Sequence, residues 1–393
     1  MGRFKRITVI VLDGVGCGEA PDAGEYGDVG SDSLGNVSRS VGGLDCPNMG
    51  RLGLGKLTEI EGVPPSLHAA GGAGKCQPAS KGKDTVTGHW ELMGIQLAQP
   101  FPVYPAGFPP EIIRMFEKQT GRGVLANKAA SGTVVIQEFG AEHLATAKPI
   151  VYTSADSVFQ IAAHEKVISV EELYGICRKC RAFLVGEHGL GRVIARPFVG
   201  DERSGFARTK RRKDFPLLPA TPTMMQRLVD AGKEVWSIGK IDDIFGHQGI
   251  TRKNHTTDNA GSTRAILDSL EQDFEGLLFA NLIEFDMIYG HRNDPRGYAD
   301  ALEAFDLALP SIVERMGVDD LGIITADHGV DPTTPGTDHS REFVPLLAFG
   351  PALDRPVELG VRETLSDVAA TLAENFELDP PLAGKGFLHA IQP

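Results

Sequence analysis

The sequence has no long apolar run, and this absence limits what kind of protein it can encode. No stretch of the 393 residues approaches the roughly 20 apolar residues that a membrane-spanning helix needs. The first apolar run, Ile7 to Leu12, is too short for the hydrophobic part of a secretory signal and ends at Asp13. With 41% hydrophobic residues, the composition is typical of a globular protein. We therefore expect a cytoplasmic protein without a membrane partner.

Positive charge is also scarce. The chain has 39 Lys and Arg against 52 Asp and Glu, a formal net charge of −13. A protein that binds nucleic acid needs a basic face against the phosphate backbone, so we expect no nucleic-acid partner. The one dense basic stretch runs from Arg208 to Lys213, and it is either a solvated loop or a surface that attracts an anionic substrate.

Cysteine is rare, and its odd count of five suggests reduced thiols rather than a disulfide framework. Cys177 and Cys180 form a CxxC pair, which is compatible with a redox or zinc site. No second Cys or His pair lies nearby to complete a zinc site. A capping box from Ser169 to Glu172 opens a predicted helix whose apolar stripe includes both thiols. The pattern therefore favours two buried core thiols.

Strand-like runs alternate with helical patterns toward both ends of the chain. A near-continuous β-branched run such as Ile7 to Leu12 is typical of a strand buried on both faces. Thr221 is predicted to cap a helix that ends at Gly232, before the strand-like segment EVWSIGK. The rhythm predicts an α/β fold with a parallel sheet between helices. Further strands are predicted at Leu277 to Phe285, Leu321 to Ala326 and Val344 to Gly350.

Two proline-rich stretches interrupt this rhythm. Gln99 to Pro110 holds five prolines and Phe215 to Pro222 holds three, which is typical of linkers. We expect residues 101–216 to form an inserted α+β cap domain, and residues 1–100 and 217–393 to form the metal-binding catalytic core. Strands are predicted in the cap at Thr133 to Phe139, Ile150 to Ser154 and Arg192 to Ala195.

Several side chains of metal-binding types flank the apolar runs. Loops that leave the carboxyl ends of parallel strands line one crevice, so residues distant in sequence can meet there. Carboxylates with imidazoles suit Zn, Mn or Fe better than Ca or Cu(I), and two such cations would attract a phosphate dianion. Singly, each Asp could be only a helix cap and each His only structural. Jointly they predict a two-metal phosphoryl-transfer site formed by Asp13, Asp286, His291, Asp327, His328 and His339.

A nucleophile is expected in KDTVTGHWELMG, Lys83 to Gly94, where a Gly-rich and Lys-rich loop enters a helix. A hydroxyl at a helix start lies near unsatisfied N–H groups that attract phosphate. Thr85 and Thr87 are both candidates. The alternative for each is that it merely caps the helix.

The motifs LDGVGCGEAPDA, KDTVTGHWE, YTSADSVFQIAAHE, GRVIARPF, NLIEFDMIYGHRNDP and ITADHGVDPTTPGTDHSRE span most of the chain. Together they resemble the bacterial pentose phosphomutases of the alkaline phosphatase superfamily. The resemblance implies an alkaline-phosphatase-like core, an inserted cap and two manganese ions. One cation would be held by Asp286, His291 and His339, and the other by Asp13, Asp327 and His328. Thr85 would carry the phosphoryl group and approach a metal.

Two residues depart from the family's pattern. Val330 stands where a polar residue is expected and Glu284 where a shorter Asp is usual. Neither is an implied ligand, so the departures concern local packing only.

The implied reaction interconverts ribose or 2-deoxyribose 1-phosphate with the 5-phosphate, through phosphorylated Thr85, a 1,5-bisphosphate and a sugar bisphosphate activator. The cap would exclude water from the phosphothreonine. The implied substrate groups are Asp156 for sugar hydroxyls and Arg196 for the distal phosphate, assisted by Arg208 and Lys240. The alternative for these four is an ordinary surface ion pair.

Three other activities remain open at this stage. A metal-dependent phosphatase or phosphodiesterase could use the same core, and a metal-stabilised binding protein could keep the ligands without turnover. Cofactor-independent phosphoglycerate mutases share the core but resemble a longer chain with a Ser nucleophile. A sulfatase is disfavoured because no C-x-P-x-R or S-x-P-x-R stretch is present. The ligand set does not choose Mn over Zn, and the sequence does not predict the oligomeric state.

Overall fold

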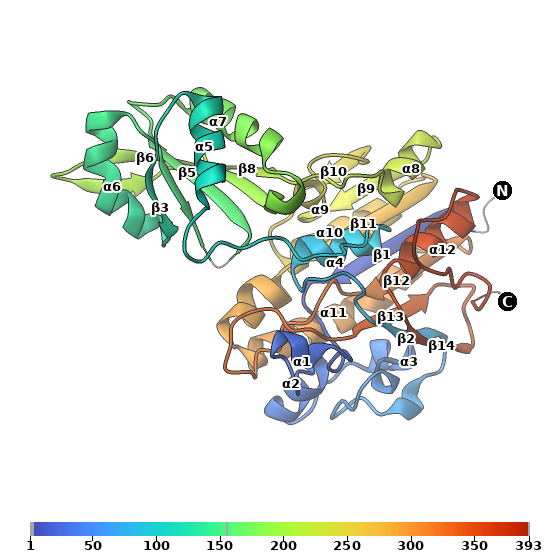
Figure 1. The fold of residues 1–393 in the computed structure, drawn as a ribbon. Coiled ribbons are helices and arrows are strands. Elements are labelled where there is room, and N and C mark those ends of the chain that lie inside the picture. Colours follow the sequence, from blue (N-terminus) through green and yellow to red (C-terminus); the bar gives the residue numbers. More distant parts are fainter. Residues whose placement is uncertain (1–3, 155, 392–393) are drawn as a thin grey trace. The chain divides into compact units, whose positions relative to one another are not determined.

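The computed structural model describes residues 4–154 and 156–391. The chain divides into two compact units. The first unit comprises Met1–Gln99 and Pro219–Pro393, and the second comprises Pro100–Leu218 (Figure 1). Among the described residues, no helix is long and apolar enough to cross a membrane.

The centre of the first unit is a strand buried along its whole length, β1 (Arg6–Leu12). It pairs in parallel with β11 (Gly276–Leu282) on one side and with β12 (Asp320–Thr325) on the other. Leu12 is level with Leu282, and Val11 is level with Thr325, so the three strands end side by side. The predicted α/β fold with a parallel sheet is confirmed for these central strands.

Within residues 4–154 and 156–391, this sheet has eight strands in the order β10-β9-β11-β1-β12-β13-β2-β14. Not all of it is parallel, because β13 runs antiparallel to both β12 and β2. The remaining strands are β2 (Gly71–Cys76), β9 (Glu234–Ile238), β10 (Arg252–Asn254), β13 (Val344–Phe349) and β14 (Pro356–Arg362).

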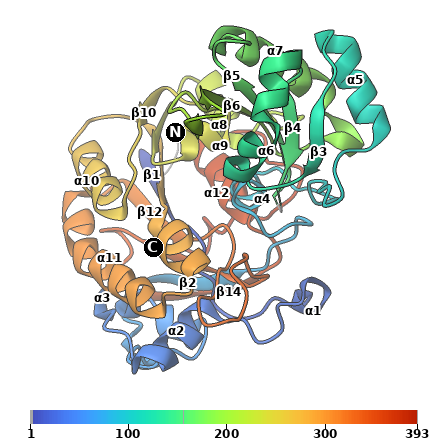
Figure 2. The same ribbon diagram turned by 90° about the vertical axis from the view of Figure 1, so that its left-hand side faces the viewer.

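Helices cover both faces of this sheet. Figure 2 has α10 and α11 on one side of the sheet and α4 and α12 on the other. Helix α2 packs against α11, while α8 packs against α12. The helices of this unit are α1 (Ala23–Tyr26), α2 (Ser33–Val41), α3 (Pro47–Arg51), α4 (Thr85–Leu92), α8 (Met224–Asp230), α9 (Ile241–Ile244), α10 (Asn259–Leu270), α11 (Pro295–Arg315) and α12 (Asp367–Phe376).

The start of α8 corrects one prediction. Its N-cap is Thr223 rather than Thr221, and Thr223 forms a reciprocal capping box with Gln226. Gln226 stands three residues after Thr223, which is the spacing that the capping box requires. Thr221 has no such partner at that spacing, so the helix begins two residues later than expected.

In the described part of the second unit, six strands form a sheet, β3-β4-β5-β6-β7 with β8 paired to β6, and there are three α-helices (Figure 1). Its core packs aromatic and aliphatic side chains between β5, β6 and the helices α5 and α7. Its elements are α5 (Pro110–Thr120), β3 (Leu125–Ala129), α6 (Gly132–Thr146), β4 (Ile150–Thr153), β5 (Val158–His164), α7 (Val170–Phe183), β6 (Arg192–Asp201), β7 (Gly205–Arg208) and β8 (Lys213–Pro216).

The strand predicted at Thr133 to Phe139 is wrong, because this segment lies inside helix α6. Its β-branched opening suggested a strand. The buried positions are Val135, Ile136, Gly140 and His143, which recur at helical spacing and pack one face of the helix. Packing of that face therefore overrides the local preference.

The CxxC prediction is confirmed. Cys177 and Cys180 are free thiols buried inside α7, and the Ser169 side chain accepts a hydrogen bond from the Glu172 N–H at the helix start. Burial raises the pKa of both thiols, so neither is poised for redox chemistry.

Candidate metal centre

The six candidate ligands come from the ends of adjacent strands. Asp13 follows β1 directly, and Asp327 with His328 follows β12. Asp286 lies in a short helical turn, η4 (Phe285–Tyr289), just after β11. Because β11, β1 and β12 are neighbours and end level, their following residues meet at one edge of the sheet.

Asp13, Asp327 and His328 form the first trio of possible ligands. All three side chains are buried. His328 Nε2 lies 3.4 Å from Asp13 Oδ1 and 3.3 Å from Asp327 Oδ2. One imidazole nitrogen thus faces two carboxylates.

Asp286, His291 and His339 form the second trio. Asp286 Oδ1 lies 3.3 Å from His291 Nε2 and 3.2 Å from His339 Nε2. The rings of His328 and His339 lie 4.1 Å apart between centroids, so the two trios adjoin. Six residues that are spread over more than 300 positions of the chain therefore gather in one place.

Four atoms at the centre of these trios are buried and make no hydrogen bond within the described chain, only carboxylate–imidazole contacts of 3.0 to 3.4 Å: Asp13 Oδ1, Asp286 Oδ1, Asp327 Oδ2 and His339 Nε2. Buried polar atoms are rarely left unpaired, because each one costs free energy. Divalent cations of the Mn or Zn type bind this set of carboxylate oxygens and imidazole nitrogens. The two trios therefore fit a pair of metal ions.

A third group of possible ligands gives a contrast. Asp242, Asp243 and His247 also lie close together. Here Asp242 Oδ2 already accepts hydrogen bonds from His247 Nδ1 at 2.7 Å and from Lys253 Nζ at 2.9 Å. This group is satisfied by its own neighbours.

Outer hydrogen bonds orient two of the imidazoles. His291 Nδ1 lies 2.6 Å from the Thr337 carbonyl oxygen, and His328 Nδ1 lies 3.0 Å from the Gly329 carbonyl oxygen. A carbonyl can only accept, so each Nδ1 carries the proton and each Nε2 is left as a free donor atom for a cation.

Proton and cation compete in the first trio. Burial alone would lower the pKa of His328, but the carboxylates of Asp327 and Asp13 raise it well above its usual value. For Asp327, burial opposes ionisation, yet the charges of His328 and His89 lower its pKa. A cation that binds His328 Nε2 must displace the proton that this site otherwise attracts.

Two residues that the sequence did not indicate support the first trio. His89, in α4, places Nδ1 3.0 Å from Asp327 Oδ2 and 2.9 Å from the Thr85 carbonyl oxygen. Asn281, in β11, donates from Nδ2 to Asp13 Oδ2 at 2.9 Å and lies 3.0 Å from His89 Nε2. His89 stood inside the KDTVTGHWE motif, but nothing in the sequence marked either side chain as buried beneath the ligands.

The two candidate threonines differ in their surroundings. Thr85 is the first residue of α4, and its Oγ1 lies 3.3 Å from His328 Nε2. Thr87 is buried, and its hydroxyl donates to Asp84 Oδ2 at 2.5 Å. The structure brings Thr85 to the first trio, whereas the Thr87 hydroxyl is engaged elsewhere.

The cap of α4 corrects a further expectation. Asp84, not either threonine, is the N-cap, and its side chain accepts from the N–H groups of Val86 and Thr87. Two of the N–H groups that were expected to attract phosphate at this helix start, those of Val86 and Thr87, are thus already taken.

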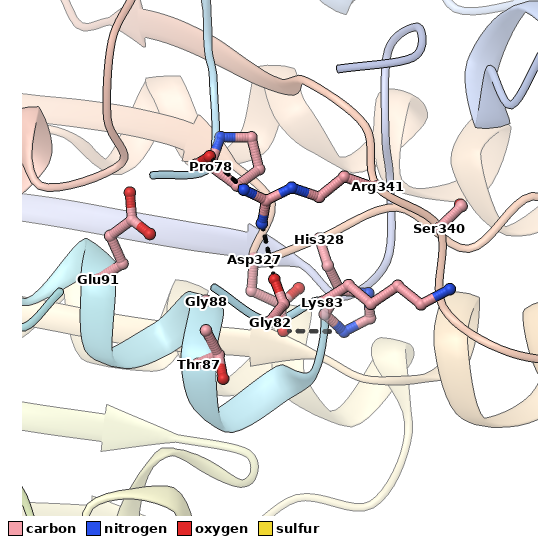
Figure 3. Close-up of a pocket in the computed structure, with 10 residues that line it drawn as sticks. All are labelled: Pro78, Gly82, Lys83, Thr87, Gly88, Glu91, Asp327, His328, Ser340 and Arg341. Carbon is pink, nitrogen blue, oxygen red and sulfur yellow. Dashed lines mark hydrogen bonds and ion pairs between the residues drawn. The ribbon is translucent and has the colours of Figure 1, made fainter. Parts of the chain in front are cut away.

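A pocket adjoins the first trio. It is lined by Lys83, Thr87 and Gly88 on one side and by Asp327, His328 and other residues on the other (Figure 3). Gly88 is required at this point, because a Cβ there would lie 2.0 Å from the Asp327 carbonyl oxygen. Helix α4 can therefore approach the loop that carries Asp327 and His328 this closely only without a side chain at residue 88.

The four predicted substrate residues are divided between the units. Lys240, in the first unit, places Nζ 3.8 Å from the Sδ atom of Met287. Met287 is the residue that follows the candidate ligand Asp286. In the second unit, Asp156 is exposed, with Oδ2 3.8 Å from Arg192 Nη2, and Arg208 is exposed on β7. Arg196 donates from Nε to Gln160 Oε1 at 3.1 Å.

Arg196 and Arg208 belong to a cationic group in the second unit. Burial raises the pKa of the Tyr152 phenol, while the nearby charges of Arg196, Arg208 and Arg212 oppose that rise. Arg196 itself is half-buried, and burial together with Arg212 lowers its pKa. Arg212 is already paired with Asp214, through hydrogen bonds of 2.7 and 2.6 Å, so Arg196 and Arg208 are the members of this group that suit an anionic ligand.

Both departures from the family pattern have a local role. Val330 is buried, and its N–H donates to the Gly14 carbonyl oxygen at 2.8 Å, beside the loop that carries Asp13. Glu284 accepts a hydrogen bond from the Asn259 N–H, at the first residue of α10. A negative charge at a helix start is favourable, so this contact stabilises the start of α10.

Comparisons with known proteins show the family to which the chain belongs. A family model described as the metalloenzyme superfamily matches residues 5–380. A protein of Herpetosiphon aurantiacus named phosphopentomutase is 62% identical over 389 residues, with 99% of this chain and 100% of the relative covered. A protein of Carboxydothermus hydrogenoformans with the same name is 54% identical, and the match covers 99% of this chain and 100% of that protein. A solved structure of Leishmania mexicana phosphoglycerate mutase is 12% identical, with a TM-score of 0.49. The match covers 98% of this chain and 97% of that one.

Proposed function

Because the chain belongs to the metalloenzyme superfamily and, within it, to the phosphopentomutase family, we propose a reaction that proceeds through phosphorylated Thr85. In this reaction, ribose or 2-deoxyribose 1-phosphate and the 5-phosphate interconvert by way of a 1,5-bisphosphate. The proposal includes a small sugar phosphate as the substrate, a sugar bisphosphate as the activator and a cytoplasmic location.

One observation carries the proposal. Two adjoining trios of carboxylates and imidazoles hold buried ligand atoms that make no hydrogen bond within the described chain, and Thr85 Oγ1 lies 3.3 Å from His328 Nε2 in the first trio. A hydroxyl beside a pair of cations is the arrangement that phosphoryl transfer to and from a side chain requires.

Asp286, His291 and His339 would hold one cation, and Asp13, Asp327 and His328 the other, with Thr85 beside them. We take the cations to be Mn²⁺, although the same donors suit Zn²⁺. When bound, the two ions supply positive charge that neutralises the phosphoryl oxygens and favours the ionised form of the Thr85 hydroxyl.

The chain's own residues then carry out the transfer. Phosphorylated Thr85 gives its phosphoryl group to the free hydroxyl of the bound sugar monophosphate, and the sugar becomes a 1,5-bisphosphate. The Thr85 oxygen then takes back the other phosphoryl group, which leaves the isomeric monophosphate. His89 holds both the Thr85 carbonyl and Asp327, so the oxygen that reacts and the ligand beside it keep a fixed spacing.

We propose that Asp156, Arg196, Arg208 and Lys240 orient the sugar phosphate. Arg196, assisted by Arg208, would bind the phosphate that is not being transferred. Asp156 would accept hydrogen bonds from the sugar hydroxyls. The second unit would also keep water from the phosphothreonine, since hydrolysis of that ester would turn a mutase into a phosphatase.

The test is an assay of the protein with ribose 1-phosphate, Mn²⁺ and a trace of ribose 1,5-bisphosphate. We expect ribose 5-phosphate to form with little free phosphate. Dominant release of inorganic phosphate would instead identify a phosphatase on the same core. Absence of turnover on any phosphoester would favour a metal-stabilised binding protein.

A further inference from the structure

Arg341 is a buried guanidinium that belongs to neither trio. Its side chain is only 1% exposed. Nε and Nη2 donate to the two carboxylate oxygens of Asp22, each at 3.0 Å. Nη1 and Nη2 also donate to the carbonyl oxygens of Pro78, Ser80 and Gly82, at 2.7 to 2.8 Å. All five N–H groups of the guanidinium are therefore used.

These contacts join two segments of the centre. The carbonyls belong to the segment between β2 and α4, and Gly82 stands three residues before Thr85. Arg341 itself stands two residues after His339. One side chain thus fastens the peptide that leads to Thr85 onto the peptide that carries a metal ligand (Figure 3).

A second link runs beside the first. Lys83 Nζ lies 3.0 Å from Asp28 Oδ2 and 3.4 Å from Asp338 Oδ2. Asp28 Oδ2 also accepts a hydrogen bond from the backbone N–H of Arg341 at 2.8 Å. The approach to Thr85 is therefore tied to residues 338–341 at two points.

Only arginine can make this set of contacts. Lysine is a point charge with three donors, and it cannot form a forked pair with Asp22 while also reaching three carbonyls. Burial by itself raises the pKa of Asp22, but the hydrogen bond and charge of Arg341 lower it, so the pair is ionised. A lysine at this position would keep the charge and leave several buried carbonyls without a donor.

We propose that Arg341 is a positioning residue for phosphoryl transfer, which fixes Thr85 relative to the two trios by holding the carbonyls of residues 78–82. This inference rests on the proposed role of Thr85. It differs from a general contribution to stability, because the effect should appear in the chemical step.

The test compares Arg341→Lys with a matched control, Arg6→Lys. Arg6 is also buried and bonded to a carboxylate, Asp320, and to a carbonyl oxygen, that of Gln272, but it lies at the opposite end of β1 from Asp13. For Arg341→Lys we expect kcat to fall about 10- to 100-fold, as for a small misplacement of a reacting group. KM and bound metal should stay near native, and hydrogen exchange should rise in residues 78–88. Arg6→Lys should lose stability and keep kcat.

Chemical rescue separates positioning from stability. In Arg341→Ala, millimolar guanidinium ion should restore part of kcat, whereas ammonium at the same concentration should not. A native kcat in Arg341→Lys, or a fall that follows loss of metal, would overturn the inference. If Arg341→Lys fails to fold, Asp22→Asn is measured in its place, because Asp22 accepts two of the hydrogen bonds of Arg341. A fall in kcat that is smaller than the one expected for Arg341→Lys supports the inference, and an unchanged kcat refutes it.

Failure of the proposed function is distinguishable from failure of this inference. Intact mass of the native protein after incubation with a sugar bisphosphate reports whether Thr85 carries a phosphoryl group. If it does not, the phosphothreonine mechanism is wrong. The exchange rates of residues 78–88 still decide whether Arg341 holds this segment.

Discussion

At the scale of single residues, the centre depends on which polar atoms are already paired. The hydroxyl of Thr87 donates to Asp84, while that of Thr85 lies beside His328. Sequence spacing could not separate the two threonines, since both stand at the start of the same helix. The partner of each hydroxyl separates them.

Alanine at each threonine tests this difference. Thr85→Ala removes the proposed acceptor of the phosphoryl group, and we expect mutase activity to fall by at least about 1,000-fold with metal content kept. Thr87→Ala loses one hydrogen bond to Asp84, at a cost of about 1 kcal/mol in the free energy of unfolding, and retains most activity. Activity assays and metal analysis of the two variants check this. The reverse result would assign the nucleophile to Thr87.

Glu342 gives a second prediction at this scale. It is fully buried and accepts hydrogen bonds from Ser33 N at 2.8 Å, Ser33 Oγ at 2.7 Å and Ser340 Oγ at 2.6 Å. Burial raises the pKa of this carboxyl from 4.5 to about 8, although the hydrogen bonds oppose the rise. Between these values the folded state binds a proton that the unfolded state has lost, so the free energy of unfolding falls as pH rises.

Glu342→Gln removes that titration and keeps the shape of the side chain. The variant should gain stability relative to the native protein from about pH 4.5 to about pH 8, and the difference should then level off. Urea unfolding at several pH values measures it. Glu358→Gln is a control of opposite sign, because the hydrogen bond from Lys56 lowers the pKa of that carboxyl. A constant difference between Glu342→Gln and native protein across the window would contradict the account.

The residues that could be named from the sequence are those that follow strands. Asp13 could be named because the apolar run Ile7 to Leu12 ends directly before it. Asp327 could be named because it follows the strand predicted at Leu321 to Ala326. His89, Asn281 and Arg341 could not, because burial beneath the ligands depends on which helix packs on which strand. The residues near each of these positions in the sequence do not indicate which helix packs on which strand.

At the scale of elements, one close approach is between α4 and the loop after β12. Gly88 lets the helix touch the Asp327 backbone, and the same helix carries Thr85 and His89. The helix thus carries both the proposed nucleophile, Thr85, and a partner of Asp327, His89. A substitution that shifts α4 away from this loop should therefore displace Thr85 and His89 together.

Gly88→Ala tests this packing. The added Cβ would lie 2.0 Å from the Asp327 carbonyl oxygen, so the helix has to shift, and we expect a large loss of activity with reduced stability. Gly175→Ala, inside α7, is the matched control, since the nearest atom there is an Arg178 nitrogen at 3.9 Å. It should gain about 0.5–1 kcal/mol from helix propensity. Native activity in Gly88→Ala, assayed alongside the control, would show that the contact is dispensable.

The strands that could be predicted from the sequence are those with a high content of apolar residues. Strands β1, β9, β12 and β13 were predictable because they are rich in β-branched or large apolar residues. Strand β2 was missed, since its sequence GGAGKC carries no such signal and its pairing with β13 and β14 depends on neighbours distant in sequence. The antiparallel direction of β13 was likewise not readable from its residues.

At the scale of the whole molecule, each unit encloses its own thiols. All five cysteines are buried and free: Cys17, Cys46 and Cys76 in the first unit, and Cys177 and Cys180 in the second. Burial raises the pKa of every one of them, so the reactive thiolate is scarce at neutral pH.

We therefore expect the native protein to react slowly with a thiol reagent and all five thiols to react after unfolding. The thiols within one unit should react together, because they become exposed when that unit unfolds. Mass spectrometry of partly labelled protein measures the order. Fast labelling of Cys177 or Cys180 in the folded protein would restore the redox interpretation of the CxxC pair.

The central claim concerns the first unit as a whole: six residues from distant parts of the chain hold two cations beside Thr85. The most direct measurement is anomalous diffraction at the manganese edge from crystals grown with Mn²⁺. We predict two peaks, one between Asp286, His291 and His339 and one between Asp13, Asp327 and His328, with Thr85 Oγ1 beside them. A single peak, or peaks at Asp242 and His247 instead, would contradict the account.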